Sequence, residues 1–128
     1  MYPLISTWTI KGGSERRAVA ALKRLAKQVN EQEPDTLVYL VHVPDMRQPS
    51  LPTPPALQVV FFEIYRSKAA FDSHVNGPVF QGFLSKHVGL FLSTKVECPD
   101  GGEVTQPYTT VEFLRREAGF IRPEALSG

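Results

Sequence analysis

Glu63 is the residue whose surroundings in the sequence point most clearly to chemistry. It lies within the apolar segment VVFFEIY (59–65), which has the composition of a buried strand. A carboxylate in such a setting loses hydration, at a cost of several kcal/mol unless it is paired. Burial raises the pKa of a carboxyl and a nearby cation lowers it, and carboxyls perturbed in either way are candidates for functional sites. The alternative is a salt bridge, within the chain or across a dimer, to Arg66, Arg115 or Arg116.

Three histidines are the other titratable candidates: His42 on a predicted strand, and His74 and His87 on or near predicted helices. Their spacing matches no short metal-binding motif, and the single cysteine, Cys98, excludes a cysteine cluster. We therefore expect no metal site. His74 follows Phe71 by three positions, which places its ring beside a buried helical stripe. The alternative for each histidine is a half-buried ring that is hydrogen-bonded to the backbone.

Aromatic side chains at predicted strand and helix positions form a third group. Small-ligand pockets combine apolar walls with a few convergent polar groups, and this sequence offers both. The alternative is that the same rings form ordinary core. The residues concerned are Trp8, Tyr39, Tyr65, Phe71, Phe80 and Phe83.

The hydrophobic pattern predicts the elements that must position these residues. Segments rich in β-branched and aromatic residues predict strands over 4–10, 36–43, 57–65 and 108–114. Apolar residues at helical spacing predict helices over 14–30 with Ser14 as N-cap, 67–76 with Ser67 as N-cap, and 78–88 opened by Pro78. Residues 92–107 are ambiguous because prolines and glycines interrupt weak strand signals, and the tail after Phe120 is expected to dock irregularly.

This order of elements, β-α-β followed by β-α-β with a broken second helix, predicts an α+β fold. The expected architecture is a ferredoxin-like four-stranded antiparallel sheet with helices on one face. We expect residues 1–128 to form one domain with two additions. These are a proline-rich loop over 44–56 and an extended C-terminal segment over 92–128.

The central strands are apolar on both faces. Val38 and Leu40 alternate with Leu37 and Tyr39, and the segment 59–65 carries apolar side chains in both sets. An antiparallel sheet with one solvated face would alternate cleanly between apolar and polar residues. We therefore expect a second copy to cover the face that the helices leave open, giving a homodimer through the sheet face. The alternative is a covering flap made by residues 44–56 and 92–107.

Composition excludes several classes of protein. The 128 residues carry 14 basic and 13 acidic side chains, and a net charge of +1 argues against nucleic acid and anionic membranes as partners. The longest apolar run is far too short to span a bilayer. The first residues lack a basic lead followed by an apolar block, so we expect no signal peptide and a cytoplasmic location.

Three segments together resemble the antibiotic biosynthesis monooxygenase family of the dimeric α+β barrel superfamily. They are EPDTLVYLVHVPD (33–45), VVFFEIYRSKAAFDSHV (59–75) and GPVFQGFL (77–84), and the resemblance extends over about residues 4–91. It implies a barrel closed by two subunits. It also implies a monooxygenase that oxidises a small aromatic phenol or quinol with O₂ and uses no cofactor.

The resemblance suggests roles for the candidate residues. His74 and His42 would take or share the substrate proton, Tyr39 and Tyr65 would hydrogen-bond a substrate oxygen, and Glu63 would orient one of these groups. The walls of the substrate pocket would be formed by Trp8, Phe71, Phe80 and Phe83. The alternative function is a non-catalytic dimeric module of the same fold that binds a small ligand or has a stress-related role.

Overall fold

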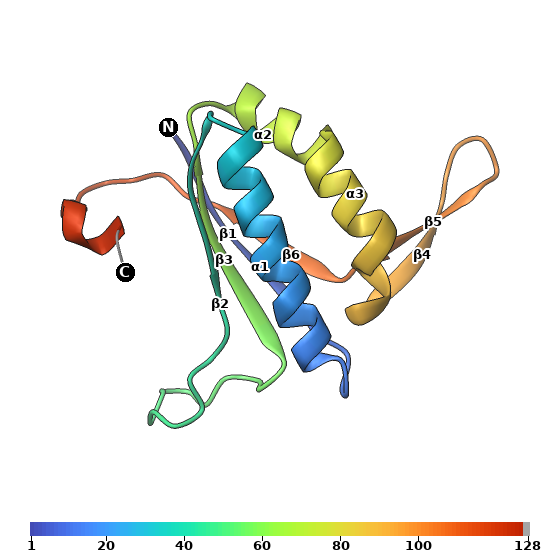
Figure 1. The fold of residues 1–128 in the computed structure, drawn as a ribbon, viewed down its shortest axis with the longest axis horizontal. Coiled ribbons are helices and arrows are strands. Elements are labelled where there is room, and N and C mark those ends of the chain that lie inside the picture. The colour runs from blue at the N-terminus through green and yellow to red at the C-terminus, as the bar shows by residue number, and fades with distance from the viewer. Residues whose placement is uncertain (127–128) are drawn as a thin grey trace.

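A four-stranded antiparallel sheet forms the base of the molecule (Figure 1). The computed structural model describes residues 1–126. The strands lie in the order β2-β3-β1-β6, and every neighbouring pair is antiparallel. This arrangement confirms the predicted ferredoxin-like α+β fold. The strand bounds are β1 Tyr2–Thr9, β2 Thr36–His42, β3 Gln58–Tyr65 and β6 Thr109–Phe113.

Three helices cover one face of this sheet (Figure 1). They are α1 (Glu15–Gln32), α2 (Lys68–Asn76) and α3 (Pro78–His87), and a 3₁₀ turn over Val88–Leu90 follows α3. The longest, α1, buries one stripe of its surface at helical spacing, which is the pattern the sequence predicts. That stripe is Ala18, Ala21, Leu22, Leu25 and Val29.

The break between α2 and α3 has a local cause. Ser67 caps α2, and its hydroxyl oxygen accepts a hydrogen bond from the Ala70 N–H at 3.1 Å. Gly77 ends α2, and Pro78 occupies the first turn of α3, where its missing N–H costs nothing. The predicted cap Ser14 stands at the N-terminus of α1, but its side chain makes no capping bond there.

Alternation along the strands decides which side chains meet the helices. Leu4, Ser6 and Trp8 of β1 are buried on the helix side, and so are Phe61 and Glu63 of β3. Trp8 lies at the centre of this core. Its ring centroid is 5.1–6.1 Å from the centroids of Phe61, Phe80, Phe83 and Phe91.

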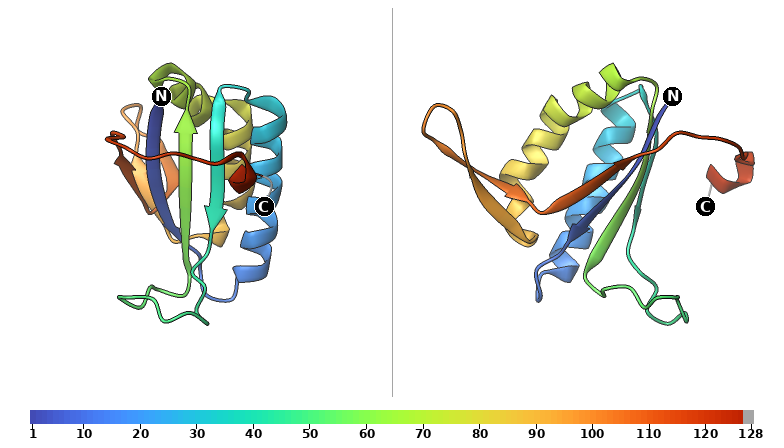
Figure 2. Two further views of the ribbon diagram at one scale, coloured as in Figure 1. Left: turned by 90° about the vertical axis from the view of Figure 1, so that its left-hand side faces the viewer. Right: turned by 180° about the vertical axis from the view of Figure 1, so that it is seen from behind.

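The opposite face of the sheet carries no helix (Figure 2, left). Leu40, Phe62 and Ile5 pair across β2, β3 and β1, and so form one apolar row on this face. Leu40 is 45% exposed, whereas Phe62 and Ile5 are half-buried. We call this surface the open face.

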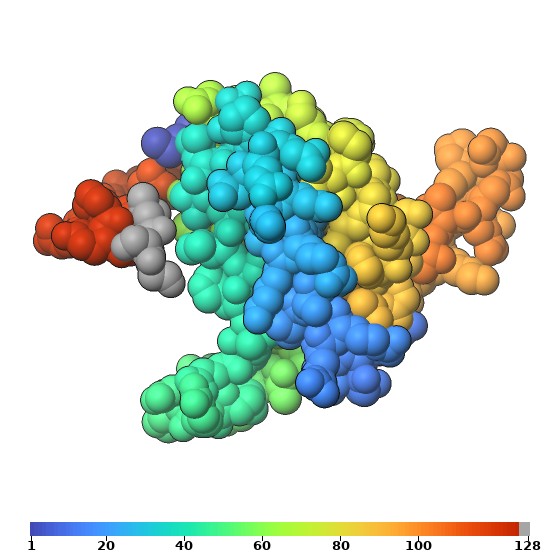
Figure 3. Space-filling model, in the orientation of Figure 1, coloured from blue at the N-terminus to red at the C-terminus, as the bar shows by residue number. Residues whose placement is uncertain are grey.

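Three segments project from the body (Figure 3). The loop 44–56 extends beyond the end of the sheet, and β4 (Ser93–Glu97) pairs with β5 (Glu103–Pro107) in a hairpin that leaves on the helix side (Figures 1 and 3). The ambiguous segment 92–107 is therefore this hairpin. Because it points away from the open face, it is not the covering flap considered above.

The tail leaves β6 on the other side of the molecule and crosses in front of the open face (Figure 2, left). Its residues 114–125 are exposed, and it ends in a 3₁₀ turn, Pro123–Leu126. Phe62 and five tail residues line a space of about 420 Å³ between them; the five are Arg116, Ala118, Gly119, Phe120 and Ile121. The tail therefore arches over the sheet rather than docking against it as predicted.

No helix within residues 1–126 combines the length and the apolar character needed to cross a membrane.

Candidate functional site

A cavity of about 220 Å³ lies between the sheet and helices α2 and α3. Its walls are mostly apolar and aromatic, and two of its residues, Glu63 and His74, are buried ionisable groups. Strands β1, β2, β3 and β6 all contribute to it. The lining residues are Leu4, Ser6, Trp8, Tyr39, Phe61, Glu63, Phe71, His74, Val75, Phe80, Thr109 and Val111.

His74 is held in a fixed orientation on α2. Its side chain is 3% exposed, and Nδ1 lies 2.6 Å from Oε1 of Glu33, the residue that ends α1. The ring packs among Tyr39, Tyr65 and Phe80 at centroid distances of 5.4, 5.5 and 5.1 Å. Burial lowers the pKa of His74, and the Glu33 carboxylate opposes this effect only in part. The imidazole is therefore neutral at neutral pH.

The second ring nitrogen of His74 is open to a ligand. Within residues 1–126, every fully buried side-chain nitrogen or oxygen has a hydrogen-bond partner. Among these residues Nδ1 bonds to Glu33, whereas Nε2 makes no hydrogen bond. Nε2 therefore borders open space and, in the neutral ring that donates from Nδ1, is the proton acceptor.

Glu63 is a buried carboxyl with a neutral partner. The hydroxyl of Tyr65 donates to its Oε1 at 2.5 Å, and the residue is 6% exposed. Burial is the main cause that raises the pKa of Glu63 to about 7, against the lowering effect of the Tyr65 hydrogen bond. The alternative of a salt bridge within the chain is wrong, because Arg66 pairs with Asp35, Arg115 pairs with Glu117, and Arg116 contacts the sulfur of Met1.

The two tyrosines near this carboxyl stay protonated. Burial raises the pKa of Tyr39 well above its ordinary value, and the charges of Glu63 and Glu33 add to the effect. The pKa of Tyr65 is raised by burial and by its contact with Glu63. Both hydroxyls are thus hydrogen-bond donors at neutral pH, and only Tyr39 lines the cavity.

Polar groups of the strand wall are bonded to one another. The indole N–H of Trp8 donates to the Ser6 hydroxyl oxygen at 3.1 Å, and that hydroxyl lies 3.2 Å from the hydroxyl of Thr109. This wall therefore presents satisfied groups, and the aromatic rings set its shape.

The structure brings most of the predicted site residues to this cavity and places three elsewhere. Tyr65 stands behind the wall, bonded to Glu63. His42 is exposed at the end of β2 and pairs with Val60 on the open-face side, so it does not reach a molecule in the cavity. Phe83 lies in the core and lines an outer groove instead.

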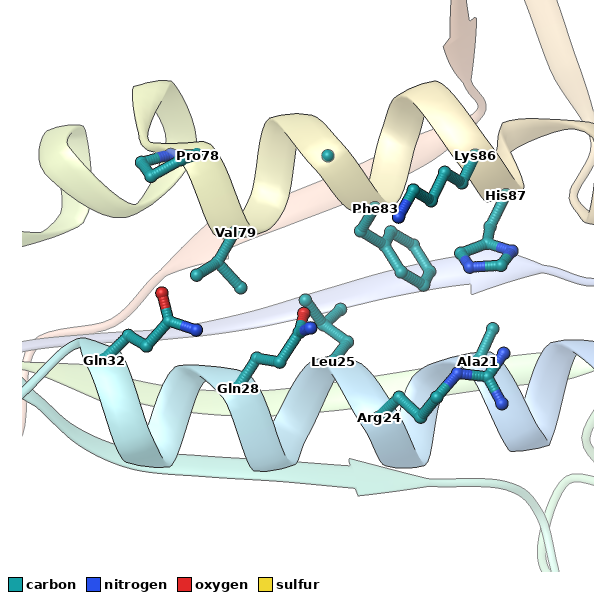
Figure 4. Close-up of a pocket in the computed structure, with 11 residues that line it drawn as sticks. Ala21, Arg24, Leu25, Gln28, Gln32, Pro78, Val79, Phe83, Lys86 and His87 are labelled. Atoms are coloured by element: carbon teal, nitrogen blue, oxygen red, sulfur yellow. The ribbon is translucent and has the colours of Figure 1, made fainter.

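That outer groove runs between α1 and α3 (Figure 4) and has a volume of about 330 Å³. Arg24, Lys86 and His87 lie at one end of it, and Gln28 and Gln32 lie toward the other. Its basic groups are near the surface, and it contains neither of the buried titratable residues. The cavity is therefore the better candidate site.

Glu33 is the functional candidate that sequence reasoning missed. Its carboxylate accepts from Thr36 Oγ1 at 3.2 Å in addition to its contact with His74. Glu33 and His74 are 41 positions apart in the chain, so no local spacing connects them. The only signal was its place as the first residue of the segment 33–45, which follows the predicted first helix and carries part of the family resemblance.

No group of three or more histidine, cysteine, aspartate or glutamate side chains within residues 1–126 is arranged to hold a metal ion.

Comparison with known proteins identifies the fold. The solved structures similar to this chain include a crystal structure of an antibiotic biosynthesis monooxygenase, with 18% identity, a TM-score of 0.67, and coverage of 92% of this chain and 100% of that one. A Pseudomonas aeruginosa protein has 20% identity and a TM-score of 0.64 over 91% and 94% of the two chains. A Mycobacterium tuberculosis protein has 17% identity and a TM-score of 0.63 over 92% and 98%. The TM-scores show a shared fold, and at identities this low the comparison shows the fold alone.

A comparison with curated proteins gives no match. The family model described as "Antibiotic biosynthesis monooxygenase" matches residues 1–86, which is more than half of the sequence and includes the cavity's helices and three of its four strands. The chain therefore belongs to the antibiotic biosynthesis monooxygenase family.

Proposed function

We propose that this protein is a cofactor-independent monooxygenase that oxidises a small phenol or quinol with O₂. The observation that carries the proposal is the buried His74–Glu33 pair at the wall of an aromatic cavity. Drug-sized ligands occupy pockets of about 300–1,000 Å³, and the smaller volume of this cavity, about 220 Å³, suits a small aromatic molecule.

His74 would act first, as the general base. The lowered pKa keeps its ring neutral, and the bond from Nδ1 to Glu33 leaves Nε2 as the acceptor. Transfer of the substrate O–H proton to Nε2 produces a phenolate, which is a much better electron donor than the phenol. The Glu33 carboxylate supports the positive charge that this transfer places on the ring.

The phenolate needs a hydrogen-bond donor in a space with little water. Tyr39 supplies one, because its raised pKa keeps the hydroxyl protonated beside an anion. Glu63, with its pKa raised to about 7, is a second donor in its protonated form. The rings of Trp8, Phe71 and Phe80 exclude water, which strengthens these interactions.

The oxidation itself uses the electrons of the substrate. The phenolate passes one electron to O₂, and the two radicals combine to form a carbon–oxygen bond at a ring carbon. The ring C–H proton of the resulting peroxide anion passes to the outer peroxide oxygen as the O–O bond breaks, which leaves a quinone carbonyl and a hydroxide. The hydroxide takes up one proton to form water, so one oxygen atom enters the product and the other leaves as water.

We also propose that the working unit is a homodimer through the open face. The apolar row of Leu40, Phe62 and Ile5 supports this, since burial of such side chains contributes about 1.5–3 kcal/mol each. The hairpin of β4 and β5 points away from this face, whereas the tail crosses in front of it, so a second copy would have to displace the tail or pack together with it.

Oxygen consumption with a panel of hydroquinones and anthrones tests the proposed reaction. We expect uptake of O₂ with at least one member of the panel, and quinone formation that stops under anaerobic conditions. His74→Ala is expected to reduce the rate by about 10²–10⁴-fold, which is the usual contribution of a general base.

His87→Ala provides the matched control, because His87 lies on α3 outside the cavity and should leave the rate unchanged. Circular dichroism of both variants checks that they are folded. Binding of panel members by the wild-type protein without any O₂ uptake would contradict the monooxygenase and favour the non-catalytic module.

A further inference from the structure

His74 stands between two separate spaces. On one side is the cavity described above, and on the other is a surface cleft of about 390 Å³ between the end of α1 and helix α2. Among the described residues, His74 is the only one that lines both. Glu33 lines the cleft and not the cavity.

Hydrogen bonds connect these spaces through the imidazole ring. Nδ1 of His74 lies 2.6 Å from Oε1 of Glu33, and Thr36 Oγ1 donates to the same oxygen at 3.2 Å. The side chain of His74 is 3% exposed, whereas that of Glu33 is 18% exposed. The path from Nε2 through Nδ1 to the Glu33 carboxylate therefore leads from the buried imidazole to a more exposed group in the cleft.

Other titratable groups face the ring, but none of them offers this route. Tyr39 of β2 and Tyr65 of β3 pack against His74, and both hydroxyls stay protonated. Glu63 of β3 lines the cavity, accepts from Tyr65, and does not border the cleft. A proton given to Glu63 would remain inside the cavity.

We propose that Glu33 is the proton outlet of this site, which exchanges the substrate proton with the surface cleft through His74. The inference rests on the proposed function. The substrate O–H bond breaks and its proton binds Nε2, while the Nδ1 proton moves to Glu33 and from there to water in the cleft. When the peroxide collapses, hydroxide takes the proton from Nε2, and Nδ1 regains one through Glu33. The relay is thereby reset, with no net gain or loss of protons.

The consequence is that the substrate proton can leave the apolar cavity through the protein's own groups. Apolar surroundings disfavour an ion, so a path that carries the released proton to the cleft assists ionisation of the substrate. Glu33 is thus a positioning and relay residue that acts on the substrate only through His74.

The test measures ionisation of a bound phenol in the absence of O₂. 4-Nitrophenol is the probe, because its phenolate is yellow and its neutral form is not. The wild-type protein is expected to bind it as the phenolate at neutral pH. Glu33→Gln keeps an acceptor for the Nδ1–H but takes up no proton, so the rate at which the bound probe ionises after a pH jump should fall about tenfold or more.

Two further variants distinguish a proton relay through Glu33 from a purely structural role of this residue. Glu33→Asp restores a carboxylate and should recover part of the ionisation rate. Asp35→Asn removes a charge from the same cleft, but Asp35 pairs with Arg66 and not with His74, so the rate should be unchanged. Equal ionisation rates in wild type and Glu33→Gln, or a probe that is bound but remains neutral in the wild type, would overturn the proposal.

A second readout needs no bound molecule. Nitrogen NMR of the His74 side chain should show the Nδ1–H form at neutral pH, and Glu33→Gln should lower the pKa of His74, since the supporting carboxylate is gone. An unchanged titration of His74 contradicts the outlet even if no phenol binds. Failure of O₂ uptake in a protein that still ionises the probe would refute the monooxygenase and leave the outlet standing.

Discussion

Glu63 and His74 are buried near one another, and burial changes their pKa values in opposite directions. It raises the pKa of the Glu63 carboxyl to about 7 and lowers that of the His74 imidazole. Both shifts favour the neutral form of the group. The cavity therefore holds two ionisable groups for which burial favours the uncharged form, a carboxyl that is a donor when protonated and an imidazole that has an acceptor nitrogen when neutral.

Glu63→Gln is expected to change how stability depends on pH. Below the ordinary value of 4.5, the carboxyl is protonated in both the folded and the unfolded chain. As pH rises from 4.5 to about 7, the unfolded carboxyl ionises first, so the free energy of unfolding falls by about 3 kcal/mol through this group. Glutamine keeps an acceptor for Tyr65 and removes this loss. Urea unfolding across this pH range measures it.

The control for this experiment is Glu103→Gln, which removes a carboxyl from an exposed position on β5, in the hairpin that points away from the open face. Its pH profile should stay parallel to that of the wild type. A Glu63→Gln profile that also runs parallel to the wild type would show that the carboxyl is not perturbed by burial.

The sequence predicted some of the candidate site residues correctly and missed others. Glu63 stood out because its neighbours are apolar, and His74 because of its position relative to Phe71. His42 was placed on the correct strand, but alternation alone does not say which face of a sheet the helices cover. The role of Glu33 as the partner of His74 depends on how the end of α1 lies against α2, and no local sequence pattern predicts that arrangement.

At the scale of elements, the junction between α2 and α3 fixes the position of His74. The two helices meet at Gly77, and a Cβ atom added there would lie 2.5 Å from the backbone oxygen of Ser73. Both helices would have to shift to relieve such a contact. The position of α2, and with it the position of the His74 ring, therefore depends on glycine at position 77.

Gly77→Ala is expected to destabilise the protein by about 1–3 kcal/mol, because the new methyl group is overpacked against backbone. Gly82→Ala on α3 is the matched control. A Cβ atom there meets nothing within 4 Å, so alanine should stabilise the helix by about 0.5–1 kcal/mol. Thermal unfolding compares the two, and equal melting temperatures would contradict the assigned contact.

The helices and strands of the sheet were predictable because each has a regular pattern of buried positions. The hairpin over 92–107 was not, because its strands are short and mostly exposed. The glycines that seemed to interrupt it form its turn. Gly101 has a φ of +88°, and the Cys98 N–H donates to the Gly102 carbonyl at 2.7 Å.

At the scale of the whole molecule, the apolar row on the open face predicts that the protein is a dimer rather than a monomer. We expect sedimentation to show a dimer at micromolar concentration. Phe62→Asp places a charge in the middle of the apolar row and should weaken dimerisation by at least about tenfold. Leu51→Asp is the control, because Leu51 is 99% exposed in the loop 44–56.

A compact wild-type monomer at micromolar concentration would contradict the proposed dimer. The apolar pattern on both faces of the strands was readable from the sequence, since it depends only on alternation. The paths of the projecting segments could not be predicted from the sequence, because few of their residues are buried against the rest of the protein.

The chain has one tryptophan, and its indole forms part of the cavity wall. Trp8 is 4% exposed, and its N–H is held by the hydroxyl of Ser6. Tryptophan fluorescence of this protein thus originates at a single place, in the wall of the cavity. Quinones quench such emission, so a quinone that bound in the cavity would report its own presence through the loss of this signal.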